Sequence, residues 1–466
     1  MKIYNLTYNI LFLFTFIVLF SCKKDDSPTV VEEEETETEN ETTGFQGEID
    51  YIKTYGGSNL DKAVSVVLAN DGNYVILGST KSTDGDIIDK TTSDEDYWLL
   101  KVKPDGEIIW SKTYGGPEDD TASSLGKTSD GGYIASGYSR GAGGDVSSNA
   151  GFHDFWVVKF SASGDLQWQK SFGFPGSDKA YKAKQTRDGG YIVAGVLDVS
   201  ASNGDGGLGS RKPEKEAGRS LQHAGGDYWV IKLSATGEMQ WRNYFGGTFT
   251  DTAYDVLQTS DGAYLVFGTS DSSDVDISEN IGTYDYWVIK VSANGELVWE
   301  KNYGGTQIEN LYTAAKTSNG SFLIFGDTRS DDINVTSKFG NADIWGAEID
   351  EEGVLLTQQS YGGLEFESAR GITQLSNGNH IVTGNTRSIN GDFDQNNGDN
   401  DALVMIIDDK LSIEFQLTVG GSTFDFAQDA IEAENNTYVI AGSTQSNDKD
   451  IPLNRGVEDL LLFKIK

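Results

Sequence analysis

Recurring carboxylates are the residues of this sequence whose type and spacing could do chemistry. One series precedes short apolar runs, and its members are 58 residues apart except for one step of 73: Asp96, Asp154, Asp227, Asp285, Asp343, Asp401 and Asp459. A second series lies four residues after a Tyr-Gly-Gly or related phrase: Asp61, Asp120, Asp178, Asp251, Glu309, Glu367 and Asp425. Paired carboxylates of this kind could hydrolyse a glycoside by acid and base catalysis.

The sevenfold repetition of these acids argues for a structural role instead. A catalytic residue is needed once or twice, and no feature of the sequence selects one pair. We therefore interpret the Asp before each apolar run as a side chain that accepts hydrogen bonds from loop backbone. The lysine five residues later, as in Lys101 and Lys232, is expected to pair with the second series of acids.

One segment offers a candidate metal site. Asp392, Asp394 and Asn396 alternate as in a calcium-binding loop, although Gly398 comes one residue later than the EF-hand glycine. Calcium is the one cofactor for which the sequence provides a candidate, and no other cofactor is expected.

The sequence shows no histidine or cysteine pattern that is typical of a metal site or a catalytic triad. The three histidines, His153, His223 and His380, have neither zinc-ligand spacing nor a Ser-His-Asp arrangement around them. His380 replaces a tyrosine of the repeat and is interpreted as a packing substitution, whereas the other two are expected to stand isolated in loops.

The elements that position these residues repeat with the same period. In the first repeat the predicted strands are residues 63–68 (A), 74–77 (B), 97–102 (C) and 108–112 (D). Asp-Gly and Asn-Gly pairs between strands A and B are typical of tight hairpins. Four antiparallel strands per repeat are one β-propeller blade. The sequence therefore predicts an all-β fold, a seven-bladed propeller of four-stranded antiparallel blades.

The two ends of the repeat region predict how the ring closes. The chain stops at Lys466 just after a strand C, and residues 47–57 match residues 106–116, which contain a strand D. The first strand is therefore expected to complete the last blade, which removes exposed sheet edges. The predicted propeller domain spans residues 47–466.

Function is assigned to the face that carries the long B–C and D–A loops, because the opposite face has only short hairpins. Strand A lines the central channel, and one position near its start varies between repeats: Val64, Ser123, Tyr181, Tyr254, Tyr312, Arg370 and Gln428. Tyr181, Tyr254, Tyr312 and Arg370 could converge at the channel mouth on a polar ligand. Alternatively, these side chains pack between blades or plug the channel.

The amino terminus predicts export and lipid anchoring. Residues 1–21 contain Lys2 and a short apolar run, as in a signal peptide. The run ends at Cys22, the only cysteine, in a phrase that resembles the lipobox of bacterial lipoproteins. This resemblance implies a lipid on Cys22. Residues 22–46 are rich in glutamate and predict an extended acidic tether. Lys23 and Lys24, followed by acids, are similar to export signals of Bacteroidota, which implies the outer membrane and its cell-surface side.

The formal net charge of −36 makes nucleic acid an unsuitable partner, because binding to phosphates needs clustered Lys and Arg. The blade phrases resemble those of large Bacteroidota surface lipoproteins. The A–B hairpin at Asn70–Ile76 looks like part of a bulb-type lectin repeat, but the mannose signature is not intact. The C–D hairpin at Thr236–Trp241 is similar to quinoprotein repeats, whose cofactor ligands are not found here.

Taken together, these features predict a surface-exposed, non-catalytic propeller that binds glycan or protein through its B–C/D–A face. A carbohydrate-active hydrolase or lyase on the same face is the first alternative, and an envelope assembly or scaffold lipoprotein is the second. A monomer is expected, attached to the membrane by its N-terminal lipid.

Overall fold

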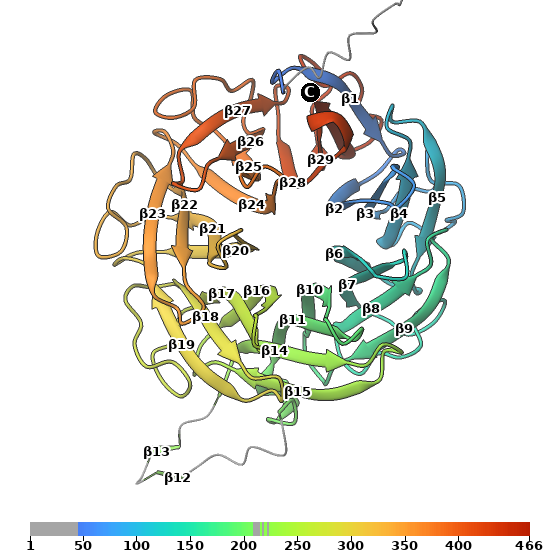
Figure 1. Ribbon diagram of the computed structural model, residues 1–466. Helices are drawn as coiled ribbons and strands as arrows, with labels where there is room; N and C mark the ends of the chain where they lie inside the picture. The colour runs from blue at the N-terminus through green and yellow to red at the C-terminus, as the bar shows by residue number, and fades with distance from the viewer. Residues whose placement is uncertain (1–44, 208–214, 217–218, 221–222) are drawn as a thin grey trace, which may run out of the picture. The chain divides into compact units, whose positions relative to one another are not determined.

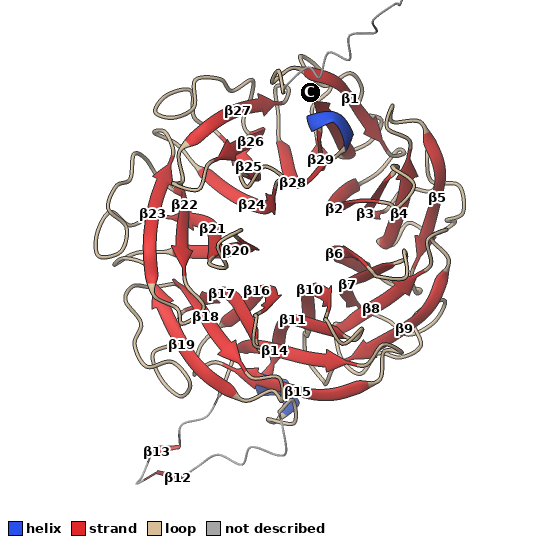
Figure 2. Cartoon of the chain, in the orientation of Figure 1, coloured by secondary structure: helices blue, strands red, loops and turns tan. Residues whose placement is uncertain are grey.

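The seven-bladed propeller is confirmed by the computed structural model, which describes residues 45–207, 215–216, 219–220 and 223–466. In this part of the chain seven four-stranded antiparallel sheets surround a central axis (Figure 1). Strand A is innermost and strand D is outermost in every blade. Almost all regular structure is β-strand (Figure 2). None of the helices found in these residues is long and apolar enough to cross a membrane.

The strands have similar lengths in all blades. In the order A to D the blades are β2 (Asp61–Leu68), β3 (Tyr74–Thr80), β4 (Asp96–Val102), β5 (Ile108–Tyr114); β6 (Asp120–Lys127), β7 (Tyr133–Ser139), β8 (Asp154–Phe160), β9 (Leu166–Phe172); β10 (Lys179–Gln185), β11 (Tyr191–Asp198), β14 (Gly226–Leu233), β15 (Met239–Phe245); β16 (Asp251–Gln258), β17 (Tyr264–Ser270), β18 (Asp285–Val291), β19 (Leu297–Tyr303); β20 (Glu309–Lys316), β21 (Phe322–Thr328), β22 (Asp343–Ile349), β23 (Leu355–Tyr361); β24 (Glu367–Gln374), β25 (His380–Thr386), β26 (Asp401–Ile407), β27 (Ile413–Val419); and β28 (Asp425–Glu432), β29 (Tyr438–Thr444), β30 (Asp459–Ile465), β1 (Ile49–Tyr55). The remaining elements are α1 (Val199–Ser202), the small hairpin β12 (Lys215–Glu216) and β13 (Arg219–Ser220), and the 3-10 helix η1 (Glu434–Asn436).

The ring closes as the sequence predicts. β1 pairs antiparallel with β30, with Ile49 opposite Ile465 and Tyr55 opposite Leu460. The Tyr55 hydroxyl also donates to the Gly106 carbonyl of the first blade at 2.6 Å. The first strand therefore completes the last blade and links it to the next one.

Aromatic side chains of strand C fill the space between blades. Trp98, Trp156, Trp229, Trp287 and Trp345 are fully buried. The Tyr97 ring lies 4.4 Å from that of Trp156 in the next blade, and its hydroxyl donates to the Trp156 carbonyl at 3.1 Å. Burial of such large apolar surfaces at every junction stabilises the ring.

Acidic B–C loops, expected to face a ligand, are tied to the Gly-Gly turns of the neighbouring connection. Asp84 accepts a hydrogen bond from the Ser58 N–H at 2.7 Å, and Asp86 accepts one from the Gly56 N–H at 3.0 Å. Gly85 between them adopts a φ of +69°, which lets both carboxylates face the same turn. The same bonds recur at Asp274 and in other blades. Many carboxylates on this face therefore serve to hold the loops through backbone hydrogen bonds.

Candidate functional site

A β-bulge aims one side chain of every inner strand. In β10, β16 and β20 the register with the neighbouring strand shifts around Tyr181, Tyr254 and Tyr312. The same shift occurs at Val64, Ser123, Arg370 and Gln428 in the remaining blades. Bulges re-aim side chains and are common next to binding sites. The position that varies most between repeats is thus the bulged position in all seven inner strands.

Four of these bulged side chains form a continuous arc around the axis, here called the tyrosine arc: Tyr181, Tyr254, Tyr312 and Arg370. The rings of Tyr181 and Tyr254 are 4.9 Å apart, and those of Tyr254 and Tyr312 are 5.2 Å apart. The Arg370 guanidinium lies over the Tyr312 ring at 3.9 Å from its centroid. All four side chains are half-buried. The structure therefore brings together the residues that the sequence predicted to converge.

The arc offers neutral hydroxyls beside a fixed cation. Burial raises the pKa of Tyr181 to about 12 and raises the pKa values of Tyr254 and Tyr312 as well. These hydroxyls stay protonated at neutral pH and can donate or accept hydrogen bonds. Asp327 lies buried nearby and accepts from Asn310 and Ser368 at 3.0 and 2.8 Å.

Further along the inner strands lie charged residues that were not predicted from the sequence. Lys184 lies 2.8 Å and Lys182 lies 3.9 Å from the buried carboxylate of Asp255 in the next blade. Burial opposes ionisation of Asp255, but the two lysines outweigh it and lower its pKa. The unusual composition of β10, with three lysines, was the available signal.

The Asp before strand C bonds the loop backbone in five blades. These carboxylates accept from the N–H four residues earlier: Asp154 from Ala150, Asp285 from Ile281, Asp343 from Phe339, Asp401 from Asn397 and Asp459 from Arg455. In the other two blades Asp96 contacts Lys90 and Asp227 contacts His223. All seven are buried, so they act as structural anchors of the B–C loops.

The second series of acids lies beside the first. Each member accepts from the backbone N–H four residues earlier, at 2.5 to 2.9 Å. A Cβ on Gly246 would come within 2.5 Å of Asp251 and 2.7 Å of Asp227, so the glycine separates the two carboxylates. The same arrangement of two buried acids around a glycine recurs at Gly56, Gly115, Gly304 and Gly420.

The predicted partners of the strand C lysines were wrong. Lys101, Lys159 and Lys232 pair with Asp71, Asp130 and Asp188, which belong to the A–B hairpins, at 2.7 to 3.0 Å. The lysine lies near the end of strand C, whereas the acids after the glycines lie at the opposite end of the blade. A strand rises about 3.3 Å per residue, so a lysine five residues along strand C is too far from the acids at the other end to contact them.

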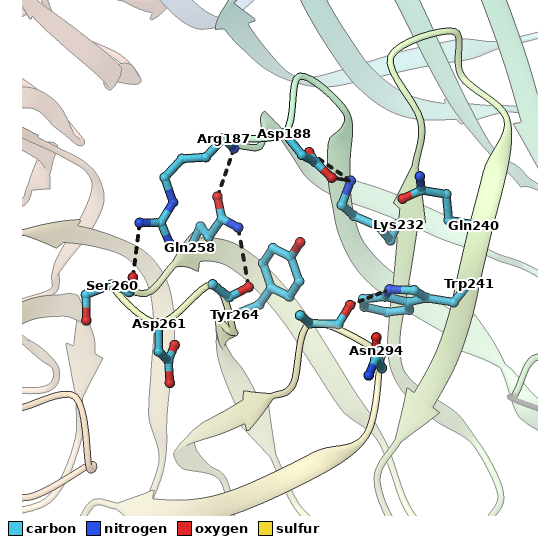
Figure 3. Close-up of a pocket in the computed structure, with 12 residues that line it drawn as sticks. Arg187, Asp188, Lys232, Gln240, Trp241, Gln258, Ser260, Asp261, Tyr264 and Asn294 are labelled. Carbon is cyan, nitrogen blue, oxygen red and sulfur yellow. Dashed lines mark hydrogen bonds and ion pairs between the residues drawn. The ribbon is translucent and has the colours of Figure 1, made fainter.

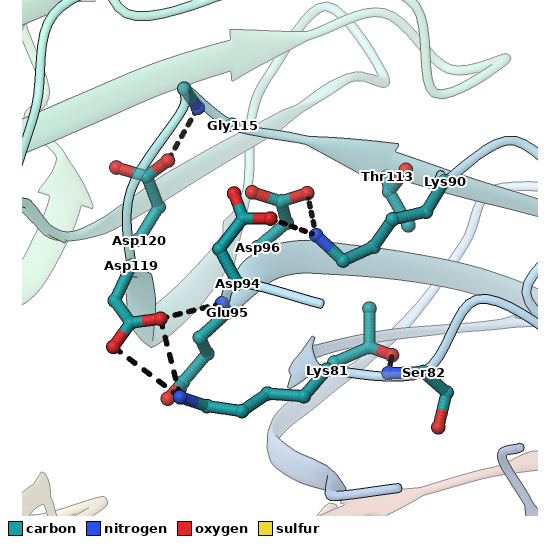
Figure 4. Close-up of polar contacts among 12 residues, drawn as sticks. Lys81, Ser82, Lys90, Asp94, Glu95, Asp96, Thr113, Gly115, Asp119 and Asp120 are labelled. Atoms are coloured by element: carbon teal, nitrogen blue, oxygen red, sulfur yellow. Dashed lines mark hydrogen bonds and ion pairs between the residues drawn. The ribbon is translucent and has the colours of Figure 1, made fainter. Parts of the chain in front are cut away.

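In the first blade a buried lysine replaces the usual backbone donor. The side chain of Lys90 is 1% exposed and lies between Asp94, at 3.6 Å, and Asp96 (Figure 4). Burial raises the pKa of Asp96 to about 6 and that of neighbouring Asp120 to about 8. Lys90 supplies the positive charge that keeps this cluster of acids together.

We expect Lys90→Met to destabilise the propeller by about 3 kcal/mol, because removing one partner leaves buried carboxylates unpaired. Urea unfolding followed by tryptophan fluorescence measures this loss. Lys81→Met is the matched control, since Lys81 is 28% exposed where it pairs with Asp119; its loss should cost less than about 1 kcal/mol. Equal effects of the two substitutions would contradict the role given to Lys90.

His223 is not isolated, contrary to the prediction. Its Nδ1 contacts the Asp227 carboxylate, and its Nε2 lies 3.7 Å from Asp276. Burial raises the pKa of Asp227 to about 7, although the contact with His223 lowers it. Sequence proximity of His223 and Asp227 was a signal for this pair, because the four-residue offset matches the backbone contact in other blades. His153 is not isolated either, because its Nδ1 lies 2.8 Å from the Ser177 hydroxyl. His380 is buried in strand β25.

The calcium candidate has two of its three residues engaged in loop bonds. Asp392 accepts from the Gly362 N–H at 2.9 Å, and Asn396 accepts from the Gly398 N–H at 2.7 Å. Asp394 is exposed. Among the residues the structure describes, no group of three or more His, Cys, Asp or Glu side chains could hold a metal ion. Calcium binding therefore stays a prediction. The predicted lipidation site, Cys22, lies outside the residues that the structure describes.

Comparisons with known proteins place this chain in no family. No protein-family model and no curated protein matches the sequence. Similar solved structures include a protein of unknown function from Bacteroides caccae (14% identity, 69% of this chain and 89% of that chain, TM-score 0.39), Sqt1 from Chaetomium thermophilum (10%, 86% and 83%, 0.41) and Synechocystis apocarotenoid oxygenase (13%, 77% and 72%, 0.40). At such identities a structural likeness concerns fold alone.

Proposed function

We propose that this chain is a non-catalytic binding propeller that recognises a glycan through the tyrosine arc, and that a lipid on Cys22 holds it at the surface of the outer membrane. The observation that carries the proposal is the unbroken contact from Tyr181 through Tyr254 and Tyr312 to Arg370. Aromatic faces stack on the apolar faces of sugar rings, and the guanidinium and hydroxyls supply hydrogen bonds to sugar hydroxyls.

Exposed apolar side chains in the B–C and D–A loops support ligand recognition on the face that these loops form. Phe152, Phe249 and Phe339 are 52%, 57% and 51% exposed, and they lie in B–C or D–A connections of different blades. Aromatic side chains at these places can contact a ligand that extends beyond the arc. The recurring acids do not favour hydrolysis, because all of them are buried and bonded within the loops.

We expect residues 23–466 to bind a subset of glycans on an array, with or without Ca²⁺. Tyr254→Ala, at the centre of the arc, should weaken binding at least about tenfold, as for a central hot-spot residue. Gln428→Ala is the matched control because it changes the bulged residue of another blade outside the arc, and it should leave binding unchanged. An array that stays blank in both conditions would contradict glycan recognition and direct the search to protein partners.

A further inference from the structure

A hollow lies on the face opposite the tyrosine arc loops, which carries the A–B and C–D hairpins. It has a volume of about 620 Å³ and opens between the third and fourth blades (Figure 3). Trp241 of β15 and Tyr264 of β17 form its aromatic wall, with ring centroids 6.0 Å apart. Ala293 and Asn294 of the β18–β19 turn also line it. The proposed glycan site does not use this face.

The walls of the hollow are held in place by the protein itself. The Trp241 indole N–H donates to the Ala293 carbonyl at 2.9 Å, and its ring packs on Gly295. A Cβ on Gly295 would lie 2.8 Å from the ring, and the glycine has a φ of +86°. Arg187 crosses from the third blade and donates to the Ser260 carbonyl at 3.1 Å (Figure 3). The hollow is thus pre-formed between fixed blades.

The chain fills the equivalent hollow between the sixth and seventh blades with its own aromatic side chain. There Phe415 and Tyr438 hold the positions of Trp241 and Tyr264, because they occupy the same places in strands D and B. The Phe45 ring lies 5.0 Å from Phe415 and 5.1 Å from Tyr438, edge-on to both.

The backbone around Phe45 shows that the two places are equivalent. Gly47 packs on Phe415 as Gly295 packs on Trp241, with a φ of +73° and a Cβ distance of 2.6 Å. Counting back two residues from each glycine places Phe45 where the fourth blade has Ala293. A phenyl ring at this position fills the space between the blades, and a methyl group leaves it open.

We propose that the hollow between the third and fourth blades binds an aromatic side chain of a partner polypeptide, in the way that Phe45 fills its counterpart. Edge-to-face contacts with two aromatic walls favour a planar ring. Gln240, Asn294 and the hydroxyl-bearing Tyr264 line the same hollow and give a tyrosine hydroxyl polar neighbours. The ion pairs Asp188–Lys232 and Asp261–Lys290 engage four of the charges around it, and backbone carbonyls of Thr259 and Ser260 accept from the Arg187 guanidinium. The polar groups of the hollow therefore suit a neutral aromatic occupant.

The test uses residues 23–466 and N-acetyl-tyrosinamide as the probe. The probe should shift the Trp241 indole N–H signal saturably in NMR spectra, with a millimolar Kd as expected for a small ligand. The signal is assigned by its loss in Trp241→Phe. Intermolecular NOEs from the probe ring to Trp241 and Tyr264 would locate it independently of any variant.

A pair of matched substitutions separates this site from others. Ala293→Phe copies the arrangement of Phe45 and should weaken probe binding at least tenfold. Ala235→Phe makes the same change beside Trp168 and Tyr191, at the junction of the second and third blades, and should leave the shift of the Trp241 signal unchanged. An absent or unsaturable shift, NOEs to other residues, equal effects of both substitutions, or stronger binding of methyl glucoside than of the probe would each overturn the proposal.

Discussion

Removal of the first strand is expected to unfold the propeller. A chain that begins at residue 56 lacks β1, which pairs with β30 along its length. It also loses apolar side chains that pack in two core clusters, among them Phe45, Ile52 and Tyr55. At about 1.5–3 kcal/mol for each buried apolar side chain, the loss approaches the total stability of a typical protein.

Circular dichroism and thermal unfolding compare the chain of residues 56–466 with those of residues 23–466 and 45–466. The two longer chains should unfold cooperatively at similar temperatures, since both contain Phe45 and β1. The shortest should lack a cooperative transition or melt far lower, and it should aggregate through the bared edge of β30. A melting temperature within a few degrees of the longer chains would show that closure by β1 contributes little.

Stability is also expected to fall as the pH rises from about 5 to 8.5. Burial raises the pKa of Asp120 to about 8 and the pKa values of Asp178 and Asp227 to about 7. It raises the pKa to about 6 for Asp96, Asp251, Asp285, Asp401 and Asp459. Each junction thus holds acids that resist losing their protons.

The sign follows from proton linkage. A group whose folded pKa is raised above its unfolded value contributes stability below the unfolded pKa, and this contribution is lost as the pH rises through the folded pKa. One pKa unit corresponds to about 1.4 kcal/mol. After relaxation of the buried pairs we expect a total loss of roughly 3–5 kcal/mol between pH 5 and 8.5.

Acids on the opposite face act in the other direction at lower pH. The hydroxyls of Thr128 and Thr259, together with Lys159 and Lys290, lower the pKa values of Asp130 and Asp261 to about 2. Their contribution is present above the unfolded pKa and is lost as the pH falls toward 2. The most stable range should therefore lie near pH 4, close to the unfolded pKa of an aspartate.

Urea unfolding at several pH values, with EDTA present to remove bound cations, measures this dependence. Asp120→Asn is the informative variant, because an amide oxygen can still accept from the Gly116 N–H and cannot ionise. It should be more stable than the parent at pH 8.5 and show a weaker pH dependence. Constant or rising stability from pH 5 to 8.5 would contradict the buried acid pairs as its cause.

The sequence by itself determined the repeat architecture. A fixed period, hairpin glycines and a matching pair of terminal segments were sufficient for blade number, strand order and closure, because each blade forms through contacts between consecutive strands. The variable position of strand A was also readable, since Tyr181, Tyr254 and Tyr312 occupy equivalent places in consecutive blades. Equivalent places on a ring lie side by side.

Contacts between blades were decided only by the tertiary structure. Spacing could not show that Lys184 meets Asp255, that Lys90 enters the acid cluster of the first blade, or that Phe45 fills a hollow whose counterpart beside Trp241 stays open. The predicted partner of Lys101 was wrong for the same reason. A repeat pattern fixes the backbone position of a residue, whereas its side-chain partner depends on rotamer, local dielectric and the substitution found in the next blade.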